Sequence, residues 1–205
     1  MRIIVSLTTW LKRIDTVYKT IDCMLNQTLK PDSIELNLSI EEFPNKEKDF
    51  SKQFCEYIKI HNNILHINYI EGNTMAFKKI IPTVKKYYNL GEYYLLSIDD
   101  DCIYDKDYIK IMIDNFENLN CDFMCMRQTG IAGSRMLYKS SCFEPDFLEN
   151  FNKLPANIIS KSVDDSYYYA YLINKGKKLG NFMPNNFSEL FSFHDEIEPL
   201  HEKYR

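Results

Sequence analysis

Three consecutive aspartates, Asp99, Asp100 and Asp101, indicate chemistry more directly than any other residues of this 205-residue sequence. They follow the apolar run at residues 93–98, which predicts a buried strand, so their carboxylates would lie at the carboxyl edge of a sheet, where open α/β folds bind ligands. Side chains alternate along an extended backbone, so we expect Asp99 and Asp101 on one face and Asp100 on the other. Such a carboxylate pair suits Mg²⁺ or Mn²⁺, which complete their shells with waters and substrate phosphates.

The acidic cluster could instead be a solvated loop that caps the next helix. We disfavour this interpretation because Asp105 is a better N-cap for the helical pattern at residues 108–116. Positive charge for phosphates could come from Lys78 and Lys79, although lysines are commonly solvated at the surface. Arg13 lies in the loop after the first predicted strand, where it could serve the same site or only pair with a surface acid.

A second acidic pair, Asp164 and Asp165, heads an aromatic, apolar helical segment at residues 166–173. These carboxylates could complement the helix dipole or cap its first turn, or they could take part in chemistry. His194 could reach back as a third metal ligand, because imidazole suits Mn²⁺ in a mixed site, or it could be a surface histidine. The loop at residues 129–133 carries two glycines that allow the backbone to approach a ligand, although an ordinary turn fits these residues equally well.

Strand-like and helix-like segments alternate along the part of the chain that must position these residues. Successive strands separated by helices predict an α/β, Rossmann-like fold with a mainly parallel central sheet, right-handed crossovers and flanking helices. Pro82 should start or kink the third helix. Strands are predicted at residues 3–7, 34–40, 64–70, 93–98 and 123–126, and helices at 14–25, 50–60, 77–88, 108–116 and 166–173.

Composition limits the partners of this chain. Its 25 basic and 29 acidic residues give a net charge of −4, and no basic stripe indicates a nucleic-acid partner. The start of the sequence is not typical of a signal peptide and no apolar stretch approaches the length of a membrane span, so we expect a cytoplasmic protein. The six cysteines lack paired C-x-x-C spacing, and we expect them to be reduced thiols, most of them in the core.

Two common phosphate-binding motifs are missing from the sequence. There is no G-x-x-x-x-G-K-[ST], which excludes P-loop kinases and ATPases, and no G-x-G-x-x-G after the first predicted strand, which disfavours dinucleotide oxidoreductases. Phosphates would have to be held in another way. A divalent ion on Asp99 and Asp101 would hold them.

Several short motifs occur together and in one order. They lie at residues 4–9 with Arg13, 25–31, 36–39 with Phe43 and Pro44, 79–83, and 98–104. In these motifs the chain resembles bacterial GT-A glycosyltransferases related to the large family-two type. The resemblance covers roughly residues 2–110 and resumes at 129–138 and 163–165. It implies a single GT-A-like domain over residues 1–205, with a nucleotide-sugar-binding half at about 1–120 and an acceptor-binding half at about 121–205.

The resemblance implies transfer of a sugar, as in hexosyltransferases, from a nucleotide-diphosphosugar, usually UDP-linked, to a hydroxyl of a saccharide or lipid-linked saccharide. A Mn²⁺ or Mg²⁺ ion would stabilise the leaving diphosphate, and a carboxylate would take the proton of the acceptor hydroxyl. Inversion at the anomeric carbon is likewise inferred from the resemblance. The expected setting is cell-surface polysaccharide or lipopolysaccharide synthesis, at the inner face of the membrane if the protein makes peripheral contact there.

The resemblance also implies roles for individual residues. Asp165, or alternatively Asp164, is expected to be the base on the acceptor side. The donor-side residues are expected to be Thr8 and Arg13 near the base or ribose, Lys79 near the diphosphate, Asp99 and Asp100 in cofactor binding, and Asp101 with Asp99 and His194 on the metal.

The chain departs from the resemblance in two places. The wider class often carries an aspartate after the second strand that recognises the base, where this chain has Ser39, and the stretch before the loop at residues 129–133 is shorter. Two alternatives therefore stay open. One is a sugar-phosphate nucleotidyltransferase, although residues 8–13 lack the glycine-rich basic loop expected of that class. The other is a catalytically silent nucleotide-sugar-binding protein that acts as a partner subunit.

Overall fold

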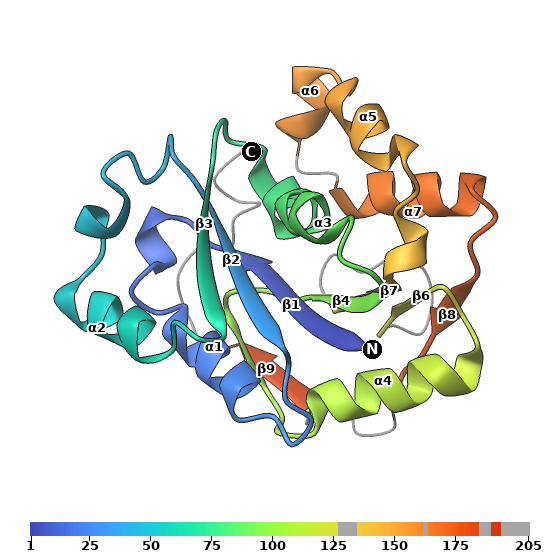
Figure 1. Ribbon diagram of the computed structural model, residues 1–205, viewed down its shortest axis with the longest axis horizontal. Coiled ribbons are helices and arrows are strands. Elements are labelled where there is room, and N and C mark those ends of the chain that lie inside the picture. The colour runs from blue at the N-terminus through green and yellow to red at the C-terminus, as the bar shows by residue number, and fades with distance from the viewer. Residues whose placement is uncertain (127–134, 162–163, 185–189, 194–205) are drawn as a thin grey trace.

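The computed structural model describes residues 1–126, 135–161, 164–184 and 190–193, and within these residues it contains one large central sheet (Figure 1). The strands of this sheet are β1 (Arg2–Thr8), β2 (Ser33–Ser39), β3 (Leu65–Ile70), β4 (Tyr93–Ser97), β6 (Phe123–Cys125), β7 (Met136–Lys139) and β8 (Leu179–Asn181). Their order is β3-β2-β1-β4-β7-β6-β8. A separate antiparallel pair joins β5 (Cys102–Tyr104) to β9 (Phe191–Phe193).

The first four strands of the central sheet are parallel to one another. β1 lies between β2 and β4, and β3 extends the sheet on the far side of β2. The second half of the chain completes the sheet differently, because β7 is antiparallel to both β4 and β6, and β8 returns parallel to β6. The carboxyl ends of the four parallel strands therefore meet at one edge of the sheet.

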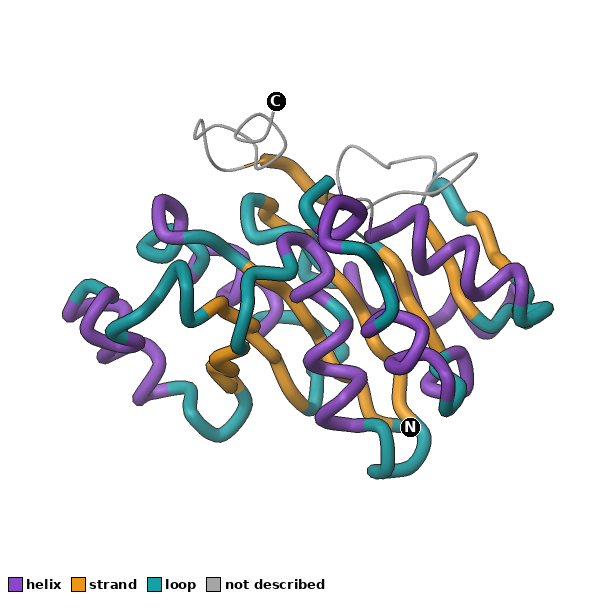
Figure 2. The backbone as a smooth tube through the Cα atoms, turned by 90° about the horizontal axis from the view of Figure 1, so that it is seen from above, coloured by secondary structure: helices purple, strands orange, loops and turns teal. Residues whose placement is uncertain are grey.

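Helices cover both faces of the sheet. The α-helices are α1 (Tyr18–Leu25), α2 (Lys52–Ile60), α3 (Ile81–Tyr87), α4 (Tyr108–Leu119), α5 (Asp146–Asn152), α6 (Ala156–Ile159) and α7 (Asp164–Asn174), and the 3₁₀ helices are η1 (Leu11–Arg13), η2 (Lys46–Asp49), η3 (Met75–Lys79) and η4 (Ser140–Cys142). Figure 1 shows α1, α2 and α4 along one face and α3, α5 and α7 along the other, and Figure 2 shows the strands side by side between them. Among the described residues, no helix combines the length and apolar character needed to cross a membrane.

The prediction of a mainly parallel α/β sheet is confirmed, and the predicted strands correspond to β1, β2, β3, β4 and β6. Two predicted helices differ from the structure. The chain forms η1 before α1, which begins only at Tyr18. The predicted helix at residues 77–88 is divided at Ile80 into η3 and α3, because Pro82 occupies the first turn of α3, where a missing N–H costs nothing.

The face covered by α1, α2 and α4 is apolar. Alternate residues of the inner strands, such as Leu7 of β1 and Leu36 of β2, are buried in one cluster with Ile21 of α1 and Phe116 of α4. Burial of each such side chain contributes about 1.5–3 kcal/mol. Because side chains alternate along a strand, the residues between them face α3 on the other side of the sheet.

Several residues of β1 and β2 that face α3 are polar and yet buried. Ser6, Glu35 and Asn37 form, with Thr83 and Tyr87 of α3, a set that we call the polar layer. Asn37 Nδ2 donates to Ser6 Oγ at 3.1 Å and to Thr83 Oγ1 at 3.0 Å, and the Tyr87 hydroxyl donates to Glu35 Oε1 at 2.6 Å. The helix is thus joined to the sheet by hydrogen bonds, as buried polar groups require.

Glu35 carries the charge of the polar layer. Its other oxygen, Oε2, accepts hydrogen bonds from Lys86 Nζ and from Asn68 Nδ2, both at 2.7 Å, and Ser33 Oγ donates to Oε1 at 2.5 Å. Burial acts to raise the pKa of Glu35, but the hydrogen bonds, that from Lys86 foremost, outweigh burial and lower this pKa. Glu35 is therefore ionised inside the protein.

Candidate active site

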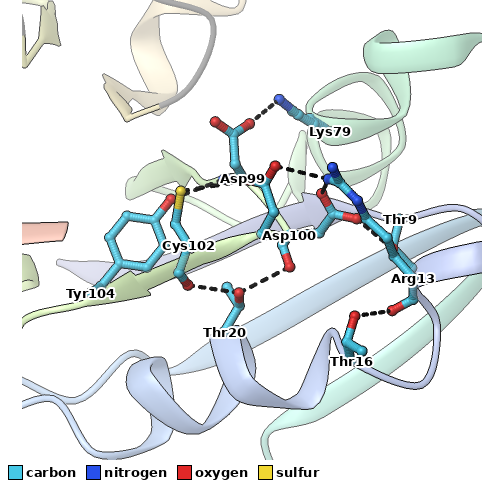
Figure 3. Close-up of polar contacts among 10 residues, drawn as sticks. Thr9, Arg13, Thr16, Thr20, Lys79, Asp99, Asp100, Cys102 and Tyr104 are labelled. Atoms are coloured by element: carbon cyan, nitrogen blue, oxygen red, sulfur yellow. Dashed lines mark hydrogen bonds and ion pairs between the residues drawn. The ribbon is translucent and has the colours of Figure 1, made fainter. Parts of the chain in front are cut away.

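The three aspartates lie in the turn between β4 and β5, beside the carboxyl end of β1 (Figure 3). The expectation that they continue an extended strand is wrong, because β4 ends at Ser97 and Asp100 and Asp101 are turn residues. Nevertheless, a carboxylate oxygen of Asp99, a carboxylate oxygen of Asp101 and the Cys102 sulfur all lie within 4.8 Å of one another. The turn, and not strand alternation, brings these groups together.

Asp100 points away from Asp99 and into the protein. Thr9 Oγ1 donates to Asp100 Oδ2 at 2.5 Å, and Arg13 Nη1 donates to Asp100 Oδ1 at 2.9 Å. Burial raises the pKa of the Asp100 carboxyl, and the charge of Arg13 offsets part of this rise. Both oxygens of Asp100 are thus engaged by residues that follow β1, and the turn is anchored from behind.

Arg13, at the end of η1, connects two of the three aspartates. The same Nη1 atom that contacts Asp100 lies 2.9 Å from Asp101 Oδ2, and Arg13 is only 2% exposed. Burial acts to lower the pKa of Arg13, but the charges of Asp100 and Asp101 outweigh burial and raise this pKa. Thr8, the last residue of β1, is also buried, and its hydroxyl donates to the carbonyl of Asn37 at 2.7 Å.

The backbone of the turn is held by two residues that lie outside the predicted site residues, Thr20 and Tyr104. Thr20 of α1 has its hydroxyl within hydrogen-bond distance of the carbonyls of Asp100, at 3.0 Å, and Cys102, at 2.7 Å. The Tyr104 hydroxyl accepts a hydrogen bond from the Asp99 N–H at 3.0 Å. A signal for Thr20 was present, because this polar residue lies in the buried stripe of an amphipathic helix.

Lys79, at the end of η3, points its ammonium at Asp99 (Figure 3). Its Nζ atom lies 2.5 Å from Asp99 Oδ1. Burial acts to lower the pKa of Lys79, but the charges of Asp99, Asp164 and Asp165 outweigh burial and raise it. Lys79 is therefore a cation surrounded by carboxylates.

Asp164 and Asp165 begin α7 and approach the same cation. Asp164 is 4% exposed, whereas Asp165 is half-buried. Burial raises the pKa of both carboxyls, and the charge of Lys79 offsets part of this rise. The charges of Asp99, from the turn after β4, and of Asp164 and Asp165, from the start of α7, thus act on the same lysine.

The remaining candidates do not join this cluster or cannot be placed. Lys78 is buried and its Nζ atom contacts Glu42 Oε2 at 2.6 Å and Asn73 Oδ1 at 2.8 Å. His194 and the loop at residues 129–133 lie outside the described residues. The N-cap of α4 is Asp107 and not Asp105, whose carboxylate instead accepts from the Asp107 N–H at 2.8 Å.

The donor groups at the turn fit a divalent cation. The two aspartates offer hard carboxylate oxygens within 4.8 Å, which suits Mg²⁺ or Mn²⁺ with waters in the remaining positions. The nearby Cys102 thiol is buried, and burial with the charges of Asp99 and Asp101 raises its pKa, so this thiol stays protonated. Asp99 and Asp101 are therefore the ligands that this turn offers.

The arrangement combines a carboxylate pair that suits a divalent cation, a lysine and two further carboxylates at one edge of a parallel sheet. A cation site with a lysine can hold the charged oxygens of a diphosphate. A partly accessible carboxylate of raised pKa, such as that of Asp165, can accept a proton from a hydroxyl. These are the groups needed to displace a phosphate leaving group by an alcohol.

No family model matches the chain, and no curated protein matches it. Solved structures do match. S. aureus TarS 1-349 in complex with UDP-GlcNAc superposes with a TM-score of 0.64 at 12% identity, over 100% of this chain and 61% of that chain. The mannosyltransferase PcManGT from Pyrobaculum calidifontis, in complex with GDP-Man and Mn²⁺, gives a TM-score of 0.60 at 12% identity, over 91% of this chain and 55% of that chain.

A third structure represents a different activity. The 4-diphosphocytidyl-2C-methyl-D-erythritol synthase from Anaerococcus prevotii superposes with a TM-score of 0.57 at 12% identity, over 89% of this chain and 86% of that chain. The chain spans less than two thirds of the length of the TarS fragment and of PcManGT. These likenesses confirm the GT-A, Rossmann-like fold that the sequence motifs predicted.

Proposed function

We propose that this chain is a metal-dependent glycosyltransferase that uses a nucleotide-diphosphosugar, in the first instance a UDP-sugar, as donor. The observation that carries the proposal is the meeting of Asp99, Asp101, Lys79 and the pair Asp164–Asp165 at the carboxyl edge of the parallel strands. Ligands of open α/β sheets bind at this edge. The ligands of the fold neighbours, UDP-GlcNAc with TarS and GDP-Man with Mn²⁺ for PcManGT, belong to the same chemical class.

On the donor side, we assign Asp99 and Asp101 to the metal ion and Lys79 to the diphosphate. When bound there, a divalent ion supplies electrostatic stabilisation of the diphosphate as the glycosidic bond breaks. Asp100 and Arg13 hold the acidic turn in position through their buried ion pair. Thr8 and Arg13 are both enclosed by the protein, so we assign their contribution to the base or ribose to the shape of the loop after β1.

On the acceptor side, we assign Asp165 as the base. It is the more accessible member of the pair, and its carboxylate lies within the field of Lys79 and Asp99. Removal of the proton from the attacking hydroxyl increases the rate of transfer by about 10²- to 10⁴-fold. Attack from the face opposite the diphosphate inverts the anomeric carbon, and the bond to the leaving oxygen breaks as the new glycosidic bond forms.

Thermal unfolding with nucleotides tests the donor site. We expect UDP or a UDP-sugar with Mn²⁺ to raise the melting temperature, since a ligand at a hundred times its Kd adds about 2.7 kcal/mol. GDP, CMP and their sugar conjugates show whether another base is preferred. Asp101→Ala should abolish the stabilisation, whereas Asp114→Ala, which removes an exposed carboxylate of α4, should keep it. No stabilisation by any of these nucleotides would contradict the proposal.

A sugar-phosphate nucleotidyltransferase is the second candidate, and the cytidylyl synthase neighbour favours it. Such an enzyme joins a nucleoside triphosphate to a sugar phosphate and releases pyrophosphate. Incubation with UTP or CTP and a sugar 1-phosphate would therefore release pyrophosphate, whereas a glycosyltransferase releases a nucleoside diphosphate from a nucleotide-sugar. A silent donor-binding subunit would be stabilised by the donor but would release neither pyrophosphate nor a nucleoside diphosphate.

A further inference from the structure

Lys79 holds the carboxylate that the proposed metal ion needs. Its ammonium lies 2.5 Å from Asp99 Oδ1, and the charges of Asp164 and Asp165 act on it as well. An ammonium and a divalent ion at the same carboxylate repel each other strongly over a few ångströms. Lys79 and the metal ion therefore compete for Asp99 when no donor is bound.

The backbone at Lys79 is fixed, so that only its side chain can leave. The hydroxyl of Ser6 donates to the carbonyl of Lys79. Ser6 Oγ also lies 2.6 Å from Thr83 Oγ1 and accepts a hydrogen bond from Asn37 Nδ2 at 3.1 Å. These three residues belong to the buried polar layer. The long, flexible lysine side chain thus starts from a fixed point, which limits where the ammonium can move.

The two cations that face the acidic turn differ in their freedom to move. The Arg13 side chain is 3% exposed and contacts both Asp100 and Asp101, whereas the Lys79 side chain is 13% exposed and faces Asp99. Removing Arg13 from its partners would leave Asp100 buried without its counter-charge. Lys79 is therefore the cation that can exchange.

We propose that the Lys79 ammonium is an exchangeable counter-ion of Asp99, which leaves that carboxylate for the donor diphosphate when a divalent ion binds. This inference rests on the proposed function. It makes metal and donor binding cooperative, because the metal ion alone must displace Lys79, while the diphosphate gives the displaced ammonium a new partner. Such coupling is reciprocal, so each ligand strengthens the binding of the other by the same factor.

Mn²⁺ binding, followed through the electron paramagnetic resonance signal of the free ion, tests the exchange without an activity assay. In the wild type we expect weak binding of Mn²⁺ alone, strengthened by UDP by a factor in the range of about 5- to 150-fold found for coupled sites. Lys79→Met should bind Mn²⁺ alone more tightly than the wild type does, by about tenfold or more, and should lose most of the strengthening by UDP.

Three variants make the result specific. Lys79→Arg keeps the charge and should bind Mn²⁺ alone as weakly as the wild type. Lys85→Met removes an exposed lysine of α3 and controls for the change in net charge. The proposal that Lys79 leaves Asp99 is overturned if Lys79→Met binds Mn²⁺ alone no more tightly than Lys85→Met does. If Asp101→Ala abolishes Mn²⁺ binding in the same experiment, the metal site itself stands. If Asp101→Ala leaves Mn²⁺ binding unchanged, the metal site itself is wrong and the exchange falls with it.

Discussion

Arg13 and Asp100 form an ion pair of 2.9 Å between residues that are 2% and 4% exposed and 87 positions apart in the chain. The pair fastens the turn after β4 to the 3₁₀ helix after β1. Because the same guanidinium also contacts Asp101, the position of one proposed metal ligand depends on a residue that does not bind the metal.

Replacing Arg13 by Met should reduce the free energy of unfolding by about 3–5 kcal/mol, because Asp100 would remain buried without its counter-charge. Urea denaturation measures this loss. Lys12→Met, which removes an exposed neighbouring cation, serves as the control and should stay within about 0.5 kcal/mol of the wild type. Equal effects of the two substitutions would show that the buried pair does not stabilise the fold.

Replacing Asp165 by Asn should leave donor binding intact and reduce sugar transfer by about 10²- to 10⁴-fold, because the amide cannot accept the hydroxyl proton. Donor affinity from calorimetry and the transfer rate from nucleoside diphosphate release separate the two effects. Asp164→Asn provides the comparison at the buried neighbouring position. Near-normal transfer by Asp165→Asn would remove this residue from the role of base.

Stability should depend on pH through Asp164. Burial raises the pKa of this carboxyl above that of the unfolded chain, so the native state holds the proton more tightly. This contribution is fully present below the unfolded pKa of about 3.9 and is lost as pH rises through the native pKa. Asp164→Asn cannot ionise, so it should gain stability relative to the wild type as pH rises, by about 1.4 kcal/mol for each unit of the pKa shift.

For Asp146, a carboxyl whose pKa is lowered, stability should depend on pH in the opposite direction. The hydrogen bond from Lys175, with that from Tyr171, lowers the pKa of Asp146, so its contribution is present above the unfolded pKa and is lost as pH falls. Asp146→Asn should therefore lose stability relative to the wild type as pH rises. Denaturation of the wild type and both variants between about pH 2 and pH 8 covers the pH range below the unfolded pKa, where Asp146 acts, and the range above it, where Asp164 acts.

Replacing Tyr87 by Phe should cost about 1.5–3 kcal/mol, because Glu35 would lose a hydrogen bond to its buried carboxylate. Thermal or urea unfolding measures the cost. Tyr88→Phe, one position along the chain, removes the same hydroxyl at a half-buried site and should have a smaller effect. A Tyr87→Phe variant as stable as the wild type would mean that water replaces the hydroxyl.

Gly180 of β8 should not tolerate even a methyl group. A Cβ atom there would lie 2.6 Å from the Cys121 sulfur and 3.2 Å from Leu119 Cδ1. We expect Gly180→Ala to cost about 1–3 kcal/mol through overpacking. Cys121→Ala should restore part of this loss in the double variant, and additive costs in a double-mutant cycle would contradict the predicted contact.

The sequence predicted those parts of the fold that depend on local patterns. Apolar runs located β1 to β4, and their alternation with helices predicted the parallel sheet. The place of β7 between β4 and β6 depends instead on pairing between distant segments, which periodicity does not encode. The polar residues of β2 show the same limit, because alternation predicts two faces but does not say that α3 buries the polar one.

At the site, the sequence located the acidic residues and the resemblance assigned their roles. Neither predicted that Asp100 would turn inward, because that orientation depends on Thr9 and Arg13, which lie about 90 positions earlier. Thr20 and Tyr104, which contact the backbone of the turn, were not predicted because threonine and tyrosine have many structural uses. Chemistry-bearing residue types can be found in a sequence, whereas the residues that orient them emerge only from the packing.

The polar layer beneath α3 also affects how the stability of this protein depends on temperature. Burial of apolar surface gives a large positive heat capacity of unfolding, whereas exposure of polar surface lowers it, by about 0.26 cal/K/mol for each Å². On this face of β1 and β2, Ser6, Glu35 and Asn37 become hydrated on unfolding where most sheets would expose aliphatic groups. The layer therefore lowers the heat capacity of unfolding, so that the free energy of unfolding of the protein changes less steeply with temperature.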